Sequence, residues 1–498
     1  MQYYSTNHKA PMADLRKAVV KGLAEDRGLY MPETIHTLPK AFFDDMPEMS
    51  FRDIAYNVAA AFFGDDVDYD ALQDLVYDTL SFDCPIVKVE DNIYALELFH
   101  GPTLAFKDVG ARFMARLLQY MLRVQSSELS DFSPADEEKS LNPQPSTLNR
   151  LVNVLVATSG DTGSAVANGF LGVEGIHVYV LYPKGKVSPI QECQFTTLGK
   201  NITAVEVDGV FDDCQRLVKS AFMDKELNQH MMLTSANSIN VARFLPQAFY
   251  YFNAVARISP TPDPSRGGEG RIYMANGSSP AQLSTNNVTT PLPPAGGAGG
   301  GAVICVPSGN FGNICAALFG HKMGLPVKRF IAANNANDVF YNYLQTGRYE
   351  PKASIQTLAN AMDVGDPSNF ARILDLYSEG GKLSPEETHR NITSLISGAT
   401  YTDEQIRQTM RQCYEQTGYI LDPHGACGYQ ALKDQLQPGE VGIFCETAHP
   451  AKFKEKVDEI LGIDVEIPDR LAAFMKGEKQ SAPMTKDFKD FKAFLMAQ

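Results

Sequence analysis

The stretch Leu151–Gly163, LVNVLVATSGDTG, is the part of the sequence that decides the fold. It opens with a continuous apolar run of strand length, Leu151–Ala157, and a glycine-rich turn follows directly. A helix is predicted to begin near Ser164. A buried strand that passes through a short turn into a helix is typical of open α/β sheets with parallel strands.

The same alternation of strand and helix continues along the chain. We expect strands at 177–182, 202–207, 303–307, 329–333 and 441–444, and helices at 188–198, 211–223, 313–323 and 451–461. The sequence therefore predicts an α/β fold with two open, mostly parallel sheets flanked by helices.

Other segments depart from this alternation. Residues 1–90 are predicted to form a separate, mainly helical N-terminal domain, with helices at Tyr56–Phe63 and Asp68–Thr79. Residues 91–498 are expected to form the catalytic region, with one lobe at 151–258, the other at 91–150 with 302–465, and a helical C-terminal tail. Two polar or Pro/Gly-rich stretches, 126–149 and 259–301, are predicted to be flexible inserts.

Composition excludes several classes of function. The 498 residues carry a net charge of -15, which argues against non-specific binding to nucleic acid or to anionic membranes. No apolar run is long enough to span a bilayer, and the first residues lack the apolar segment of a secretory signal. The eight cysteines are scattered without C-x-x-C spacing, so we expect reduced thiols, no metal site and a cytoplasmic location.

Two glycine-rich loops each join a predicted strand to a helix. The first is Ser159–Gly163 and the second is Ser308–Asn313, SGNFGN. Free backbone N–H groups and the helix dipole favour an anion at such a point, and open α/β sheets bind ligands at the carboxyl ends of their strands. Together the loops predict a site for two anionic groups, although either glycine set could serve only the turn.

A lysine lies in a third motif, His100–Asp108, HGPTLAFKD. Lys107 is placed at a helix start, between apolar neighbours and beside Asp108, which is expected to cap the helix. Desolvation and the positive end of the dipole both lower the pKa of an amine, as Schiff-base chemistry requires. The alternative is a surface lysine.

Six motifs in the same order resemble threonine synthase of the longer, bacterial and fungal form. They are HGPTLAFKD, ATSGDTGSAV, SANSINVARFLPQ, VPSGNFGN, NAMDVGDPSNF and TAHPAKFKE, and GLAEDRGLYMPE is similar to the family's N-terminal domain. The resemblance covers nearly the whole chain outside the inserts. It implies a fold-type II enzyme that depends on pyridoxal 5'-phosphate and converts O-phospho-L-homoserine and water to L-threonine and phosphate.

The resemblance also assigns residues to the cofactor. Lys107 would bind pyridoxal phosphate covalently and later move protons on the substrate. The second loop would hold the cofactor phosphate, and Thr447 would face the pyridine nitrogen, where a neutral hydroxyl tunes the ring as an electron sink. The alternative for Thr447 is a cap on the helix at Ala451. The expected cofactor set is Lys107, Gly309, Asn310, Phe311, Gly312, Asn313 and Thr447.

Other residues would bind the substrate. The first loop would contact the cofactor and the substrate carboxylate, and Arg243, with a guanidinium suited to phosphate oxygens, would bind the substrate phosphate. The alternative for Arg243 is a surface ion pair; Lys184, Lys186 and His100 are weaker candidates. The expected substrate set is Ser159, Asp161, Thr162, Gly163, Asn237, Ser238 and Arg243.

The sequence departs from the family pattern at Cys445-Glu446, which brings a carboxylate next to Thr447. Two alternatives remain open: another enzyme of the same cofactor fold, such as a serine/threonine dehydratase or a β-replacement enzyme, and an inactive relative that only binds a phosphorylated ligand. The expected partner is a small-molecule substrate, and the protein is expected to be a monomer or a homodimer.

Overall fold

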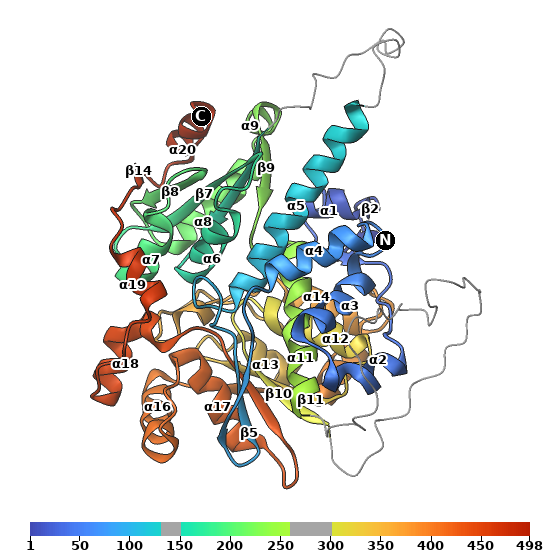
Figure 1. Ribbon diagram of the computed structural model, residues 1–498, viewed down its shortest axis with the longest axis vertical. Helices are drawn as coiled ribbons and strands as arrows, with labels where there is room; N and C mark the ends of the chain where they lie inside the picture. The colour runs from blue at the N-terminus through green and yellow to red at the C-terminus, as the bar shows by residue number, and fades with distance from the viewer. Residues whose placement is uncertain (131–150, 259–300) are drawn as a thin grey trace, which may run out of the picture.

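The structure, a computed structural model, describes residues 1–130, 151–258 and 301–498 (Figure 1). Most of the two expected inserts lies outside these residues. The first insert begins later than expected, because residues 126–130 continue the helix α5 (Lys107–Ser130). Within the described part of the chain, no helix combines the length and apolarity needed to cross a membrane.

The first sheet has five strands in the order β14-β8-β7-β6-β9, all parallel. Every residue of β6 is buried, as expected for a central strand covered by helices on both faces. The strands are β6 (Val152–Ala157), β7 (Ile176–Pro183), β8 (Ile202–Val207), β9 (Met232–Ser235) and β14 (Ala482–Met484).

The second sheet has six strands in the order β12-β11-β10-β13-β5-β4. Only the edge pair β4–β5 is antiparallel. The strands are β4 (Ile86–Glu90), β5 (Ile93–Glu97), β10 (Ala302–Pro307), β11 (Val327–Asn334), β12 (Ile396–Thr400) and β13 (Gly442–Glu446). The prediction of two mostly parallel sheets is therefore confirmed.

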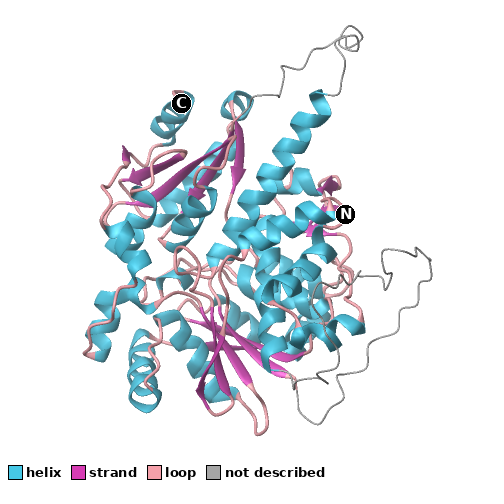
Figure 2. Ribbon diagram, in the orientation of Figure 1, coloured by secondary structure: helices cyan, strands magenta, loops and turns pink. Residues whose placement is uncertain are grey.

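Helices pack around both sheets and fill the space beside them (Figure 2). Those near the first sheet and its connections are α5, α6 (Asp161–Phe170), α7 (Pro189–Thr196), α8 (Phe211–Met223), α9 (Lys225–His230), α10 (Val241–Phe244), η4 (Leu245–Gln247) and α11 (Ala248–Ile258). Those that follow are α12 (Gly312–Lys322), α13 (Val339–Thr346), η5 (Asn360–Met362), α14 (Phe370–Tyr377), α15 (Pro385–Leu395), α16 (Asp403–Thr417) and α17 (Pro423–Gln435).

The N-terminal segment combines helices with a small sheet that the sequence did not predict. The antiparallel order is β2-β1-β3, and the elements are β1 (Gln2–Ser5), β2 (Ala13–Asp14), α1 (Leu15–Lys21), β3 (Tyr30–Pro32), α2 (Lys40–Asp45), η1 (Met46–Glu48), α3 (Phe51–Phe63) and α4 (Tyr69–Thr79). Buried Arg372 on α14 ties this segment to the rest, because its Nη2 donates to the carbonyl oxygens of Tyr30 at 3.1 Å and Ile239 at 2.6 Å.

The C-terminal tail is η6 (Pro450–Phe453), α18 (Lys454–Leu461), α19 (Asp469–Met475), β14 and α20 (Phe488–Met496). It was expected to be helical, but β14 pairs with β8 and extends the edge of the first sheet. Three residues are too few for a pattern of alternating burial to be visible in a sequence. The tail thus runs from the second sheet back to the first, as Figure 1 shows in orange and red.

Candidate active site

Lys107 and Thr447 are neighbours through their backbones. The turn before α5 pairs with the segment after β13: Phe106 N–H donates to the Thr447 carbonyl oxygen at 2.9 Å, and Ala105 forms an antiparallel bridge with Ala448. Leu104 allows the turn with a positive φ of 57°. The structure thus brings together two residues that the sequence assigned to one cofactor.

The amine of Lys107 lies in an apolar and electrically balanced setting. Its Nζ lies 5.3 Å from the centre of the Phe106 ring. The pKa of Lys107 is lowered to about 8, chiefly by burial; the charge of Asp161 opposes this effect, and the charges of Lys452 and Arg243 add to it. A substantial fraction of this amine is therefore neutral near physiological pH.

Asp108 does not cap the helix, contrary to expectation. It lies within the first turn of α5, and its buried carboxylate accepts from the Thr103 N–H at 2.8 Å and from the Thr103 hydroxyl at 2.7 Å. Asp108 therefore shapes the turn before Lys107. The helix begins at Lys107, two residues earlier than a cap at Asp108 would require.

The first glycine loop follows β6 and leads into α6. Gly160 has a φ of 143°, and its N–H and that of Gly163 both donate to the Thr158 hydroxyl, at 2.9 and 2.8 Å. Thr158 thus satisfies two of the donors that were expected to attract an anion. Ser159 and Thr162 lie in the same turn, at the carboxyl end of a central strand.

Asp161 brings a carboxylate into this loop, and buried Lys452 pairs with it. Lys452 Nζ lies 2.6 Å from Asp161 Oδ1, and the Gln191 side chain donates to the same oxygen at 2.8 Å. Burial acts to raise the pKa of Asp161, but the charges of Lys452 and Lys107 outweigh it and hold the pKa below its usual range. Sequence reasoning gave Lys452 no role, although it lies in the motif TAHPAKFKE; a further signal was the need for a cation beside an acid in an anion-binding loop.

The second glycine loop leads from β10 into α12. Phe311 occupies the cap position with a φ of 62° and no side-chain hydrogen bond, so the first N–H groups of α12 have no cap from that residue. A Cβ on Gly309 would lie 2.7 Å from the Ala361 carbonyl oxygen, and one on Gly312 would lie 2.9 Å from Ser238 Cβ. Both glycines are therefore required by close approach.

Asn313 and Asn310 fix this loop to its neighbours. Asn313 Oδ1 accepts from the hydroxyls of Tyr250 and Tyr251, the second at 2.8 Å, while its buried Nδ2 has no partner. Asn310 Nδ2 donates to the Ser238 hydroxyl at 3.0 Å. The segment after β9 thus meets the loop after β10, and the carboxyl ends of the two sheets face one site.

Arg243 is buried, with an exposed fraction of 2%, and forms no ion pair with any described acid. Its Nη1 donates to the Lys107 carbonyl oxygen at 3.0 Å, and its buried Nε has no partner. Burial lowers the pKa of Arg243 to about 10. The nearby Asn237 also has a buried, unpartnered Oδ1. The alternative of a surface arginine paired with an acid does not hold.

Thr447 is buried, and its hydroxyl has no hydrogen-bond partner among the described residues. It does not cap the following turn, because His449 Nδ1 accepts from the Ala451 N–H at 3.1 Å. The neighbouring Glu446 turns toward α17, where it accepts from the Asp422 N–H. Complete burial, followed by the charge of Asp422, raises the pKa of Glu446 well above its usual range.

Three weaker candidates stay outside this arrangement. Lys184 and Lys186 are exposed in the loop after β7. His100 contacts Glu97, with 2.8 Å between Nε2 and Oε2, and its ring lies against Phe99. Within the described chain, no side-chain hydrogen bond or ion pair joins any of the three to the other candidate residues, and each has an ordinary structural explanation.

Comparison with known proteins agrees with this arrangement. Residues 2–80 match the family model of the threonine synthase N terminus, residues 298–445 match that of pyridoxal-phosphate-dependent enzymes, and residues 425–495 match that of the threonine synthase C-terminal region. The threonine synthase of Haemophilus influenzae is 40% identical, with 100% of both chains covered.

Solved structures give the same result. The crystal structure of threonine synthase from Escherichia coli is similar with a TM-score of 0.81 and 37% identity, covering 100% of both chains. The structure of pyridoxal-phosphate-bound threonine synthase from Brucella melitensis has a TM-score of 0.81 and 30% identity, covering 100% of this chain and 99% of the other. With its two parallel sheets, this chain belongs to the threonine synthase family of fold-type II, pyridoxal-phosphate-dependent enzymes.

Proposed function

We propose that this chain converts O-phospho-L-homoserine and water to L-threonine and phosphate, with Lys107 as the residue that binds pyridoxal phosphate. The observation that carries the proposal is the setting of Lys107. Its amine is desolvated, the preceding residue Phe106 is joined by its backbone to Thr447, and Arg243 donates to the Lys107 carbonyl oxygen. Membership of the threonine synthase family supports the choice of reaction.

The residues present fit pyridoxal phosphate. The uncapped N-terminus of α12 and the buried, unpartnered amide of Asn313 are donors suited to the cofactor phosphate. Gly309 and Gly312 keep that loop free of side chains, and the Thr447 hydroxyl is available to the pyridine nitrogen. When bound, the cofactor withdraws electrons and stabilises the carbanions of the reaction.

The chain's own groups supply the proton transfers and the orientation. Lys107, with a pKa of about 8, can accept a proton from a substrate carbon and return it at neutral pH. Thr447 offers a buried, neutral hydroxyl.

The substrate requires two further anion sites, one for its carboxylate and one for its phosphate. The loop Ser159–Gly163 is proposed for the carboxylate, through donors that Thr158 does not already satisfy. Arg243, Asn237 and Ser238 are proposed for the phosphate. Arg243 suits this role because it is a buried cation without an acidic partner and with an unpartnered Nε.

The proposal also covers the cellular location, the partners and the oligomeric state of the protein. A net charge of -15 and the absence of a membrane-spanning helix from the described residues fit an enzyme that works in the cytoplasm on a small molecule, without nucleic acid or membrane. We propose a monomer or a homodimer. Two lobes, each built around one sheet, would bind the substrate between them.

The test is to incubate the purified chain with O-phospho-L-homoserine and measure both phosphate and threonine. Equal amounts of the two products are expected, and Lys107→Ala should form neither. Release of phosphate without threonine, or activity on threonine or serine instead, would contradict the proposed reaction. A colourless protein that binds the substrate unchanged would identify a binding protein.

A further inference from the structure

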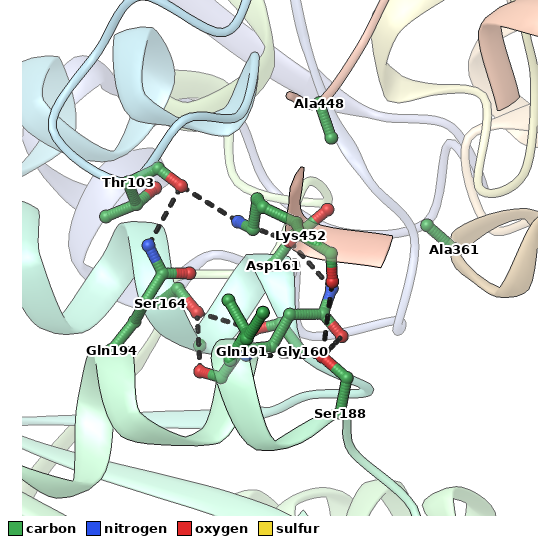
Figure 3. A network of polar contacts seen from close by, with 12 residues as sticks. Thr103, Gly160, Asp161, Ser164, Ser188, Gln191, Gln194, Ala361, Ala448 and Lys452 are labelled. Atoms are coloured by element: carbon green, nitrogen blue, oxygen red, sulfur yellow. Dashed lines mark hydrogen bonds and ion pairs between the residues drawn. The ribbon is translucent and has the colours of Figure 1, made fainter. Parts of the chain in front are cut away.

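Lys452 is a buried lysine to which the reaction described above gives no role. Its side chain is 0% exposed, and its Nζ lies 2.6 Å from Asp161 Oδ1 and 2.8 Å from the Thr103 carbonyl oxygen. Figure 3 shows the amine between these two groups, with Gln191 and Gln194 completing the network. A fully buried lysine is rare unless it is paired, and this one has a specific partner.

The ion pair joins three segments of the active site. Lys452 lies in η6, five residues after Thr447, and therefore moves with the carboxyl end of β13 in the second sheet. Asp161 begins α6 at the carboxyl end of β6 in the first sheet. Thr103 belongs to the turn that leads to Lys107, and the Gln194 side chain donates to the same carbonyl oxygen at 3.0 Å. The lysine thus links both sheets to the segment that carries the reactive amine.

Asp161 creates an electrostatic difficulty that this pairing resolves. Its carboxylate lies in a loop proposed to bind an anion, and a free negative charge there would repel a substrate that carries both a carboxylate and a phosphate. The same charge lies near enough to Lys107 to oppose the effect of burial on its pKa. Asp161 nevertheless forms its ion pair with Lys452, and no ion pair with Lys107 occurs in the described chain.

We propose that Lys452 is a positioning residue of the active site, which holds Asp161 as its own ion-pair partner and so keeps that carboxylate from capturing Lys107 or repelling the substrate. The proposal rests on the proposed function, since it takes Lys107 as the cofactor lysine. In Lys452→Met the carboxylate of Asp161 loses its partner, and Lys107 is the other cation whose charge acts on it. Asp161→Asn removes the charge that Lys452 balances.

The experiment measures how readily Lys107 is acylated in the full-length, cofactor-free chain as a function of pH, with mass spectrometry of the Lys107 peptide. The neutral amine is the reactive form, so the midpoint of the profile reports its protonation. Lys452→Met should move the midpoint upward by about one to three pH units, and Asp161→Asn should move it downward. The double variant Asp161→Asn/Lys452→Met, which has neither charge, should return it close to that of the unmodified chain.

Controls separate charge from packing. Lys452→Gln, which keeps hydrogen-bonding capacity, should behave like Lys452→Met, whereas Lys492→Met at an ion pair with Asp224 should change nothing. With substrate, Lys452→Met should raise KM. If the single variants fail to fold while the double variant folds, the pairing of charges is itself supported.

Two results would overturn the proposal: an unchanged Lys107 profile in the folded single variants, or a double variant that also fails to fold. The first would mean that Lys452 does not act on Lys107, and the second that it only fills space. The acylation profile needs neither substrate nor turnover. A failure of the proposed function, seen as absence of threonine from the unmodified chain, is therefore distinguishable from a failure of this inference.

Discussion

At the scale of single residues, Lys107 is the group on which the proposed chemistry depends. Its amine is desolvated, and the residue before it, Phe106, donates its backbone N–H to the Thr447 carbonyl oxygen. Reduction of the loaded protein with borohydride, followed by peptide mass analysis, should find the cofactor on Lys107. Lys107→Ala should retain the fold, lose the covalent cofactor and lose nearly all turnover. An adduct on any other lysine would disprove the assignment.

Arg243 is expected to bind the phosphate of the substrate and not the phosphate of the cofactor, so its replacement should affect only the first. Removing a buried charge-assisted pair costs about 2–5 kcal/mol, so Arg243→Ala should lower kcat/KM for O-phospho-L-homoserine by roughly thirtyfold or more. Cofactor content should remain normal, and inhibition by free phosphate should weaken in parallel. Arg243→Lys should recover only part of the activity, because an ammonium keeps the charge without the planar fork.

Arg216, an exposed arginine paired with Asp213 on the surface, provides the matched control, and Arg216→Ala should leave the kinetics unchanged. Because Arg243 also donates to the Lys107 carbonyl oxygen, a competing outcome exists. Loss of cofactor from Arg243→Ala with phosphate inhibition intact would mean that Arg243 supports Lys107 and does not bind the substrate phosphate.

The sequence points to single residues where they lie in a motif and fails where a partner comes from elsewhere. Lys107 was chosen because its motif, HGPTLAFKD, resembles that of the family; its apolar neighbours alone left a surface lysine open. The Asp161–Lys452 pair could not be predicted, because one residue follows β6 and the other follows β13 in a different sheet. Asp108 was misassigned because a sequence does not show whether a carboxylate turns forward to a helix or back to Thr103.

At the scale of secondary structure, continuous apolar runs located the central strands. The predicted strand at 202–207 agrees with β8, and the predicted helix at 211–223 agrees with α8. The short strands β1, β2, β3 and β14 were not predicted, because two to four residues are too few to show an alternation of apolar and polar side chains. At 451–461 one helix was expected, but a 3-10 turn precedes α18 and carries Lys452 into the interior.

Helix α17 allows a matched test of close packing. A Cβ on Gly425 would lie 1.5 Å from Glu446 Oε2, and Glu446 is fully buried, so the carboxyl cannot move to solvent. Gly425→Ala should therefore destabilise the protein by about 1–3 kcal/mol or more and reduce turnover, because the end of β13 leads to Thr447. Thermal unfolding and steady-state kinetics measure both effects.

Gly428, on the same helix, is the control. Its added Cβ would lie 3.2 Å from Phe444 Cβ, a contact that small shifts can relieve. Gly428→Ala should cost clearly less stability than Gly425→Ala. Equal effects of the two substitutions would show that helix flexibility, and not the contact with Glu446, sets the requirement for glycine.

At the scale of the whole molecule, Arg372 joins the N-terminal segment to the catalytic region. It lies over the Phe244 ring at 4.1 Å and donates to carbonyl oxygens of Tyr30 and Ile239. Arg372→Met would keep the apolar volume but leave buried carbonyls unpaired, each at a cost of about 1–3 kcal/mol. We expect a lower melting temperature and earlier proteolytic cleavage within residues 1–80 than elsewhere.

Arg257 also donates to the N-terminal segment, at the carbonyl oxygens of Pro47 and Met49, but it is exposed. Water can replace those bonds, so Arg257→Met should have a smaller effect on both measurements. If cleavage in Arg372→Met is spread evenly along the chain, the N-terminal segment unfolds together with the rest, and the arginine has no special role in its attachment.

The strand order of the six-stranded sheet also has a consequence for how the protein is made. Strand β5 emerges early, but β10 and β13, which lie beside it, emerge far later, and Lys452 comes later still. At about 5–20 residues per second, a ribosome needs on the order of 20–70 s to pass from Lys107 to Lys452. During that interval the nascent chain carries unpaired strand edges and a reactive amine without its surroundings. During synthesis the unpaired strand edges are therefore exposed, and chaperones at the ribosome would protect them from pairing with other chains.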